Sequence, residues 1–227
     1  MFGQEQYFQN LSPEQQHRLR QIRILNQNMK KGEILFTGSS LMEQFPINEL
    51  QLTYGIQKII YNRGIGGFKT TDMMHYMEEM VFATEPSKIF INIGTNDIGS
   101  ADFTKDGLLE NYRKILEEIL ERLPETEIYI MAYYPINDVD LPKDQEWLVE
   151  TFKTRTTENV NMMNEALAGF AEEMHCKFID VNEGLADERG MVKSDIIQIF
   201  LKRHAESFCN KMRSMISCDI FHFCNVL

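Results

Sequence analysis

The chain has 227 residues, a length that suits one compact domain or one domain with a short appended arm, so we expect a single active site. Hydrophobic residues make up 43% and charged residues 25%, a balance typical of a globular protein with a sizeable core. The formal net charge of -11 argues against nucleic acid and anionic lipid surfaces as partners, because both bind clustered lysine and arginine.

The N-terminal sequence has neither the basic nor the apolar region of a signal peptide, and no stretch reaches the ~20 apolar residues that span a bilayer. We therefore expect a cytoplasmic protein without a membrane span. The cysteines lack the CxxC spacing of zinc sites and redox pairs, so free thiols are the simpler interpretation. They are Cys176, Cys209, Cys218 and Cys224.

In chain order, the sequence begins with a predicted helical arm over residues 1–30, where Ser12 and Pro13 are placed as an N-cap and a first-turn proline. Five short apolar runs then indicate strands. They are residues 33–37, 58–62, 88–93, 127–134 and 177–181. Between them, apolar residues recur at helical spacing over residues 73–81, 108–123 and 160–174.

This alternation of strands and helices predicts an α/β fold, a three-layer α/β/α sandwich. A parallel crossover needs a connection about as long as these helical segments, which places helices on both faces of a mostly parallel sheet of five strands. In such open sheets ligands bind where the strands end. The residues just after each strand are therefore the candidates for a site.

Three strand ends carry polar or glycine-rich runs, at residues 38–40 (Gly-Ser-Ser), 62–67 (Asn-Arg-Gly-Ile-Gly-Gly) and 94–97 (Gly-Thr-Asn-Asp). Each has an ordinary explanation as a helix cap, a turn with positive φ, or an Asn that bonds its local backbone. Their order and shared position at one sheet edge instead favour acyl transfer, which needs a nucleophile and donors aimed at a developing oxyanion.

With these blocks the sequence resembles the SGNH, or GDSL-like, hydrolases, and is similar to bacterial members likened to platelet-activating-factor acetylhydrolase. The resemblance implies a flavodoxin-like sheet and divides the chain into an arm at 1–30, a hydrolase core at 31–193 and a divergent segment at 194–227. It also implies that Ser40 is the nucleophile, while Ser39 stands where the family most often has Asp. The implied oxyanion donors are the Ser40 and Gly67 N–H groups and the Asn96 amide.

The family's last block, Asp-x-x-His, is altered in this chain. His204 lies about where the family's histidine is expected, but Leu201 stands in place of its Asp. A literal Asp-x-x-His occurs as Asp219 to His222, only five residues from the end of the sequence. We favour His204 as the general base. Its apolar neighbours at helical spacing also fit the alternative that His204 is a half-buried helix residue without a catalytic role. If the family's C-terminal segment has been replaced in this chain, the catalytic base would be impaired.

The resemblance implies hydrolysis of a small acyl ester, with acetyl as the favoured acyl group, and no cofactor or metal. Two alternatives stay open. The first is an acyltransferase or thioesterase on the same site, because all three reactions share the acyl-enzyme step. The second is a catalytically impaired relative that binds acylated ligands. The expected partner is the small ester substrate, and a homodimer is left open.

Overall fold

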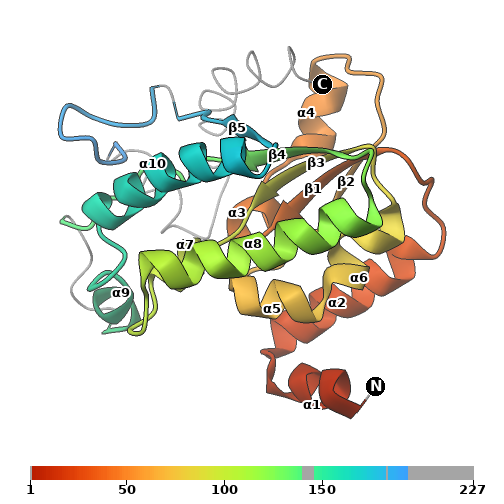
Figure 1. Ribbon diagram of the computed structural model, residues 1–227, viewed down its shortest axis with the longest axis horizontal. Helices are drawn as coiled ribbons and strands as arrows, with labels where there is room; N and C mark the ends of the chain where they lie inside the picture. Colours follow the sequence, from red (N-terminus) through yellow and green to blue (C-terminus); the bar gives the residue numbers. More distant parts are fainter. Residues whose placement is uncertain (1, 140–145, 183, 194–227) are drawn as a thin grey trace.

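The computed structural model describes residues 2–139, 146–182 and 184–193. Its centre is a five-stranded parallel sheet in the order β2-β1-β3-β4-β5 (Figure 1). The strands are β1 (Ile34–Gly38), β2 (Ile60–Asn62), β3 (Lys88–Asn92), β4 (Glu127–Met131) and β5 (Lys177–Ile179). All five predicted strands are confirmed, and the sheet is parallel throughout rather than mostly parallel.

The strand predicted over residues 127–134 ends earlier, at Met131. The Ala132 N–H still donates to the Ile179 carbonyl of β5, but the Tyr133 N–H donates to the side-chain oxygen of Asn164 at 2.7 Å. A helix side chain therefore takes over from the neighbouring strand at this position. The predicted strand was too long because Tyr133 and Tyr134 continue the apolar run past the last hydrogen bond between β4 and β5.

The helices connect these strands and cover both faces of the sheet (Figure 1). The N-terminal helices are α1 (Phe2–Asn10), α2 (Pro13–Asn26), α3 (Ser40–Glu43) and α4 (Ile47–Thr53). Next in the chain are α5 (Thr70–His75), α6 (Met77–Met80), the 3-10 turn η1 (Phe82–Thr84) and α7 (Thr95–Ile98). The later helices are α8 (Lys105–Arg122), α9 (Glu146–Thr151) and α10 (Thr157–Glu173).

Three predicted helices are confirmed and one is corrected. Helix α2 begins after Ser12, which caps it, and has Pro13 in its first turn, while α8 and α10 match the predicted apolar periods. The segment at 73–81 is two short helices rather than one. The break is at Tyr76, whose backbone leaves helical geometry (φ -127, ψ 26) while its ring is fully buried near that of Phe68.

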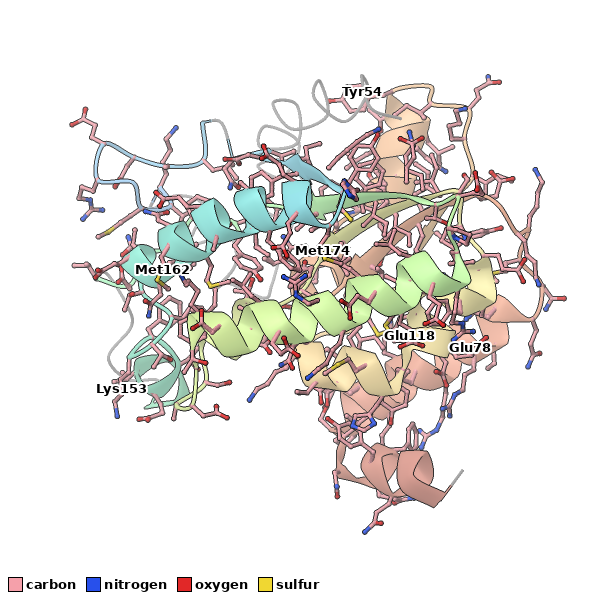
Figure 2. The ribbon with its side chains drawn as sticks, in the orientation of Figure 1. Tyr54, Glu78, Glu118, Lys153, Met162 and Met174 are labelled. Atoms are coloured by element: carbon pink, nitrogen blue, oxygen red, sulfur yellow. The ribbon has the colours of Figure 1, made fainter. Side chains whose placement is uncertain are left out.

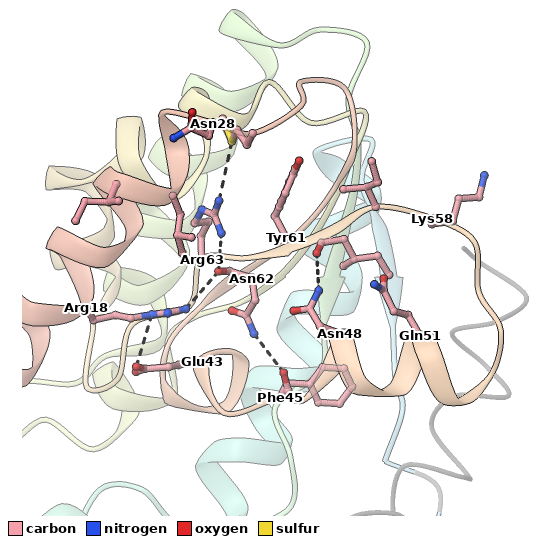
Figure 3. Close-up of a pocket in the computed structure, with 15 residues that line it drawn as sticks. Arg18, Asn28, Glu43, Phe45, Asn48, Gln51, Lys58, Tyr61, Asn62 and Arg63 are labelled. Atoms are coloured by element: carbon pink, nitrogen blue, oxygen red, sulfur yellow. Dashed lines mark hydrogen bonds and ion pairs between the residues drawn. The ribbon is translucent and has the colours of Figure 1, made fainter.

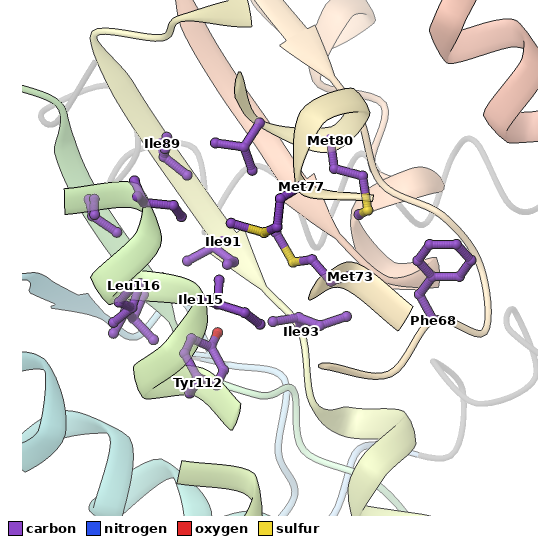
Figure 4. Packing of buried hydrophobic residues seen from close by; sticks show 14 of the residues in the cluster. Phe68, Met73, Met77, Met80, Ile89, Ile91, Ile93, Tyr112, Ile115 and Leu116 are labelled. Carbon is purple, nitrogen blue, oxygen red and sulfur yellow. The ribbon is translucent and has the colours of Figure 1, made fainter. Parts of the chain in front are cut away.

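Alternate residues of each strand point to opposite faces, and the two faces have separate cores. On one face, side chains such as Leu35, Ile89 and Ile91 share a core with residues of α2, α5, α6, α8 and α10. Figure 4 shows Ile89 and Ile91 among side chains of α5, α6 and α8. On the other face, Phe36 and Phe90 stack with ring centroids 4.7 Å apart and pack against α3 and α4. At the surface of the larger layer, Arg122 forms ion pairs with Glu78 of α6 and Glu118 of α8. Figure 2 labels these two glutamates.

Helix α2 belongs to the predicted N-terminal arm, yet it is built into the larger core. Its Leu19 and Ile22 are both 0% exposed and join the cluster that covers the central strands. Burial of two such side chains contributes about 3 to 6 kcal/mol, which favours the docking of the helix on this core. The N-terminal end of α2 therefore has a defined position near the candidate site.

Candidate active site

Ser40 begins α3 directly after β1, at the carboxyl edge of the sheet. The chain turns at Gly38, which has φ +142 and lies so close to β3 that a Cβ atom would meet the Asn92 carbonyl oxygen at 1.9 Å. The Ser39 hydroxyl is buried, whereas Ser40 is partly exposed. Of the two neighbouring hydroxyls, Ser40 is the one that a ligand can reach.

The glycine-rich loop after β2 packs directly on α3. At Gly64, a Cβ atom would meet the Glu43 backbone nitrogen at 2.3 Å, so the loop and the helix touch backbone to backbone. The Gly66 N–H donates to the Glu43 carboxylate at 2.5 Å, and a Cβ atom on Gly66 would lie 3.9 Å from the Ser40 Cβ. These contacts bring the second sequence block next to Ser40.

One N–H group in this loop lacks an acceptor. The N–H groups of residues 63–66 donate, in chain order, to Phe36 O, Asn62 Oδ1, Gly38 O and Glu43 Oε2. Those of residues 68–70 donate, in chain order, to Ile65 O, Asp72 Oδ2 and the Asp97 carboxylate. Gly67, which is exposed and has φ +78, donates to no acceptor within the described ranges. The Ser40 N–H likewise has no acceptor in this part of the chain. Two backbone donors are thus available to a ligand.

Asn96 lies on α7, directly after β3, and its amide is held on both sides. Its Nδ2 donates to the Phe68 carbonyl at 2.9 Å, and its Oδ1 accepts from the Arg155 guanidinium at 3.0 Å. One of the two amide hydrogens is left for a ligand, beside the loop that carries Gly67. The third sequence block is therefore joined by a direct hydrogen bond to Phe68, the residue that follows the second block.

Asp97, the next residue of α7, also bonds to the segment that follows the glycine-rich loop. Its carboxylate accepts from the Thr70 N–H at 3.0 Å and from the Thr70 hydroxyl, at the start of α5. Burial raises the pKa of this carboxyl above its ordinary value, against the lowering effect of the Thr70 hydrogen bonds. Asn96 and Asp97 together fasten α7 to both ends of the 68–70 segment.

Sequence reasoning missed three side chains that support this site. Gln15 and Arg18 of α2 donate to the Gly66 and Gly64 carbonyls, each at 3.0 Å. Arg155, which precedes α10, holds Asn96, and burial lowers the pKa of its guanidinium to about 10. No local pattern marks these residues, because each acts on a partner more than 40 positions away.

A groove of about 750 Å³ lies along the edge strand β2, between α2 and α4 (Figure 3). Asn48 donates to the Ile60 carbonyl at 2.8 Å, while Arg18 and Arg63 donate to the Asn62 carbonyl. These side chains occupy the outward carbonyls of β2, which hinders the addition of another strand. Ser40, Gly67 and Asn96 do not line this groove, although Arg18 and Glu43, which contact the glycine-rich loop, do.

The described histidines do not form hydrogen bonds with Ser40. His17 on α2, His75 at the end of α5 and His175 after α10 are all exposed. His204 and the Asp219 to His222 block lie outside the described residues. In the ranges that the structure describes, no group of three His, Cys, Asp or Glu side chains is placed to hold a metal ion.

The fold and the strand-end arrangement define an α/β protein with a partly exposed serine and N–H groups without acceptors at the carboxyl edge of a parallel sheet. The model of the GDSL-like lipase/acylhydrolase family matches residues 47–197, more than half of the sequence, and the chain belongs to this family. The match begins after the Ser40 block and ends before His204. No helix in the described part of the chain is long and apolar enough to cross a membrane.

Solved structures share this fold. A protein from Streptococcus pneumonia described as a platelet activating factor is 31% identical, with a TM-score of 0.66 over 80% of this chain and 81% of that one. A protein from Bacteroides fragilis described as an acylhydrolase is 17% identical, with a TM-score of 0.63 over 78% and 83%. A GDSL-like lipase from Bacteroides thetaiotaomicron is 15% identical, with a TM-score of 0.58 over 82% and 95%. The last two show the shared fold. Among curated protein sequences, none matches the chain.

Proposed function

We propose that this acylhydrolase cleaves a small acyl ester, with acetyl as the preferred acyl group, through an acyl-Ser40 intermediate. One observation carries the proposal: the Ser40 N–H, the Gly67 N–H and one Asn96 amide hydrogen are without acceptors among the described residues. The loop that carries Gly67 packs next to Ser40, which is partly exposed. Donors arranged in advance around the reacting carbonyl stabilise the charge that develops on its oxygen.

In this mechanism the Ser40 oxygen forms a bond to the acyl carbon, and the carbonyl oxygen becomes the oxyanion held by the three donors. The serine proton passes to a histidine, which then gives it to the departing alcohol as the ester bond breaks. Water, activated by the same histidine, attacks the acyl-serine and releases the acid. A base is needed because a neutral hydroxyl is a weak nucleophile without one. We propose His204 for this role, because it lies about where the family's histidine is expected.

The Leu201 substitution bears on how fast this chemistry runs. In a triad, the carboxylate partner fixes the tautomer of the histidine and stabilises the imidazolium. Leu201 stands at the family's Asp position and offers neither effect. We therefore propose weak esterase activity, and an impaired relative that binds acylated ligands is the second candidate function.

The test is hydrolysis of p-nitrophenyl acetate, compared with the butyrate ester and an acetyl thioester, by the wild type and the S40A and S39A variants. We expect acetate hydrolysis that S40A abolishes and S39A retains, since the Ser39 hydroxyl is buried. Transfer of acetyl to an added alcohol in preference to water would favour the acyltransferase alternative. Hydrolysis that survives in S40A would overturn the proposed nucleophile, and a wild type inert towards all three esters would favour the impaired relative.

A further inference from the structure

The peptide group between Gly66 and Gly67 contains both the carbonyl that α2 contacts and the N–H that lacks an acceptor. In a planar trans peptide, the carbonyl and the N–H point in opposite directions. The Gly66 carbonyl accepts from the Gln15 side chain at 3.0 Å. The Gly67 N–H is therefore directed away from α2, so whatever fixes the carbonyl also fixes the direction of this donor.

Gly66 is held at both of its backbone polar groups. Its N–H donates to the Glu43 carboxylate on the Ser40 helix, and its carbonyl accepts from Gln15 on α2. The fit around the next residue is equally close, since a Cβ atom on Gly67 would meet the Gln15 Nε2 at 2.9 Å. Glycine freely adopts many backbone conformations, so these outside contacts are what select one orientation of this peptide.

The orientation of the Gln15 amide is itself determined by α2. Gln15 is the third residue of the helix, and its Oε1 accepts from the Ser12 backbone N–H at 3.0 Å, as part of a capping box. Because a backbone N–H only donates, the amide oxygen must face Ser12 and the Nε2 must face Gly66. The cap of the N-terminal helix thus aims a donor at the glycine loop.

From this geometry we infer that Gln15 is a positioning residue for the oxyanion donor Gly67. This inference rests on the proposed function and extends the site to a helix that lies outside the region matched by the family model. Removing a whole oxyanion donor lowers turnover roughly 100- to 1000-fold. Loss of the Gln15 contact leaves Gly67 present but free to turn, so we expect a decrease of about 10- to 100-fold in kcat, with a smaller change in KM.

Four variants separate positioning from helix stability. Q15M removes the contact to Gly66 and one half of the capping box without adding charge, while S12A removes only the other half. Q15E retains an acceptor for the Ser12 N–H but loses the donor, and Q21E adds the same charge at an exposed position of α2. We expect kcat to fall in Q15M and Q15E alone, whereas the melting temperature falls in Q15M and S12A and recovers in Q15E.

A second measurement does not depend on turnover. In protein labelled with ¹⁵N-glycine, we expect the Gly66 and Gly67 amide signals to shift in Q15M and to keep their wild-type positions in S12A. Wild-type kcat in Q15M, or a lowered kcat with unshifted glycine signals, would overturn the inference. If the wild type hydrolyses no ester, the proposed function fails, and unshifted glycine signals in Q15M would then overturn the positioning role separately.

Discussion

The Arg155 guanidinium donates to the Asn96 amide oxygen at 3.0 Å, and the same amide donates to the Phe68 carbonyl on its other side. This pair of contacts fixes which way the Asn96 amide faces, because its oxygen must lie toward Arg155. A cation on the amide oxygen also polarises the group and strengthens its remaining N–H as a donor. The pKa of Arg155 is lowered to about 10 by burial, so the side chain is still charged at neutral pH.

We therefore predict that R155M lowers kcat about 10- to 100-fold in p-nitrophenyl acetate hydrolysis, less than the roughly 100- to 1000-fold loss for a removed oxyanion donor, because the Asn96 amide itself remains. R155K should fall between the wild type and R155M, since lysine supplies charge without the planar guanidinium. The matched control is R113M, which removes an arginine that pairs with Glu173 at the surface and should retain wild-type kcat. Equal kcat in R155M and R113M would show that Arg155 serves stability alone.

Asn96 itself should have a larger effect. We predict that N96A lowers kcat roughly 100- to 1000-fold while KM changes little, because the amide binds the oxyanion more strongly than the ground-state carbonyl. Steady-state kinetics across a range of ester concentrations checks this. N48A is the control, since Asn48 also donates to a backbone carbonyl but lies at the β2 edge. A raised KM with unchanged kcat would make Asn96 a binding or turn residue.

The altered ending of the chain leads to a prediction about the base. If His204 is the base, H204A abolishes the esterase activity and H222A retains it. L201D should raise kcat, because restoring a carboxylate partner recovers part of an effect that reaches about 10⁴ in a triad. Measuring the three variants with one ester decides the assignment. Activity that is lost in H222A and retained in H204A would transfer the role to the Asp219 to His222 block.

The raised pKa of the buried Asp97 carboxyl leads to a prediction about how the stability of the fold depends on pH. Its folded pKa is raised by burial, so the folded state holds this proton more tightly than the unfolded state. The stabilising contribution is therefore present below the ordinary pKa of 3.8 and is lost as the pH rises through the folded value. Urea unfolding of the wild type and D97N at pH 4 and pH 7 measures this. We expect the difference in free energy of unfolding, D97N minus wild type, to be more favourable to D97N at pH 7 than at pH 4. A difference more favourable to D97N at pH 4 would contradict the raised pKa of Asp97.

Much of the fold was predictable from local sequence. Each strand is a short apolar run, and the longer helices carry apolar residues at helical spacing, both of which depend only on neighbours in the chain. Strand ends were less predictable, as Tyr133 shows, because a side chain from α10 satisfies its backbone. The break at Tyr76 was also missed, since apolar spacing continues through it while the buried ring departs from the helix.

The sequence by itself determined the three strand-end blocks and their order, because parallel strands bring their carboxyl ends to one edge. Only the tertiary structure decided which donors at that edge are free and what holds them. Gln15 and Gly66 are 51 positions apart, and Arg155 and Asn96 are 59 apart. Such contacts arise from how α2 and the segment before α10 pack on the sheet, and packing between distant elements leaves no periodic trace in the chain.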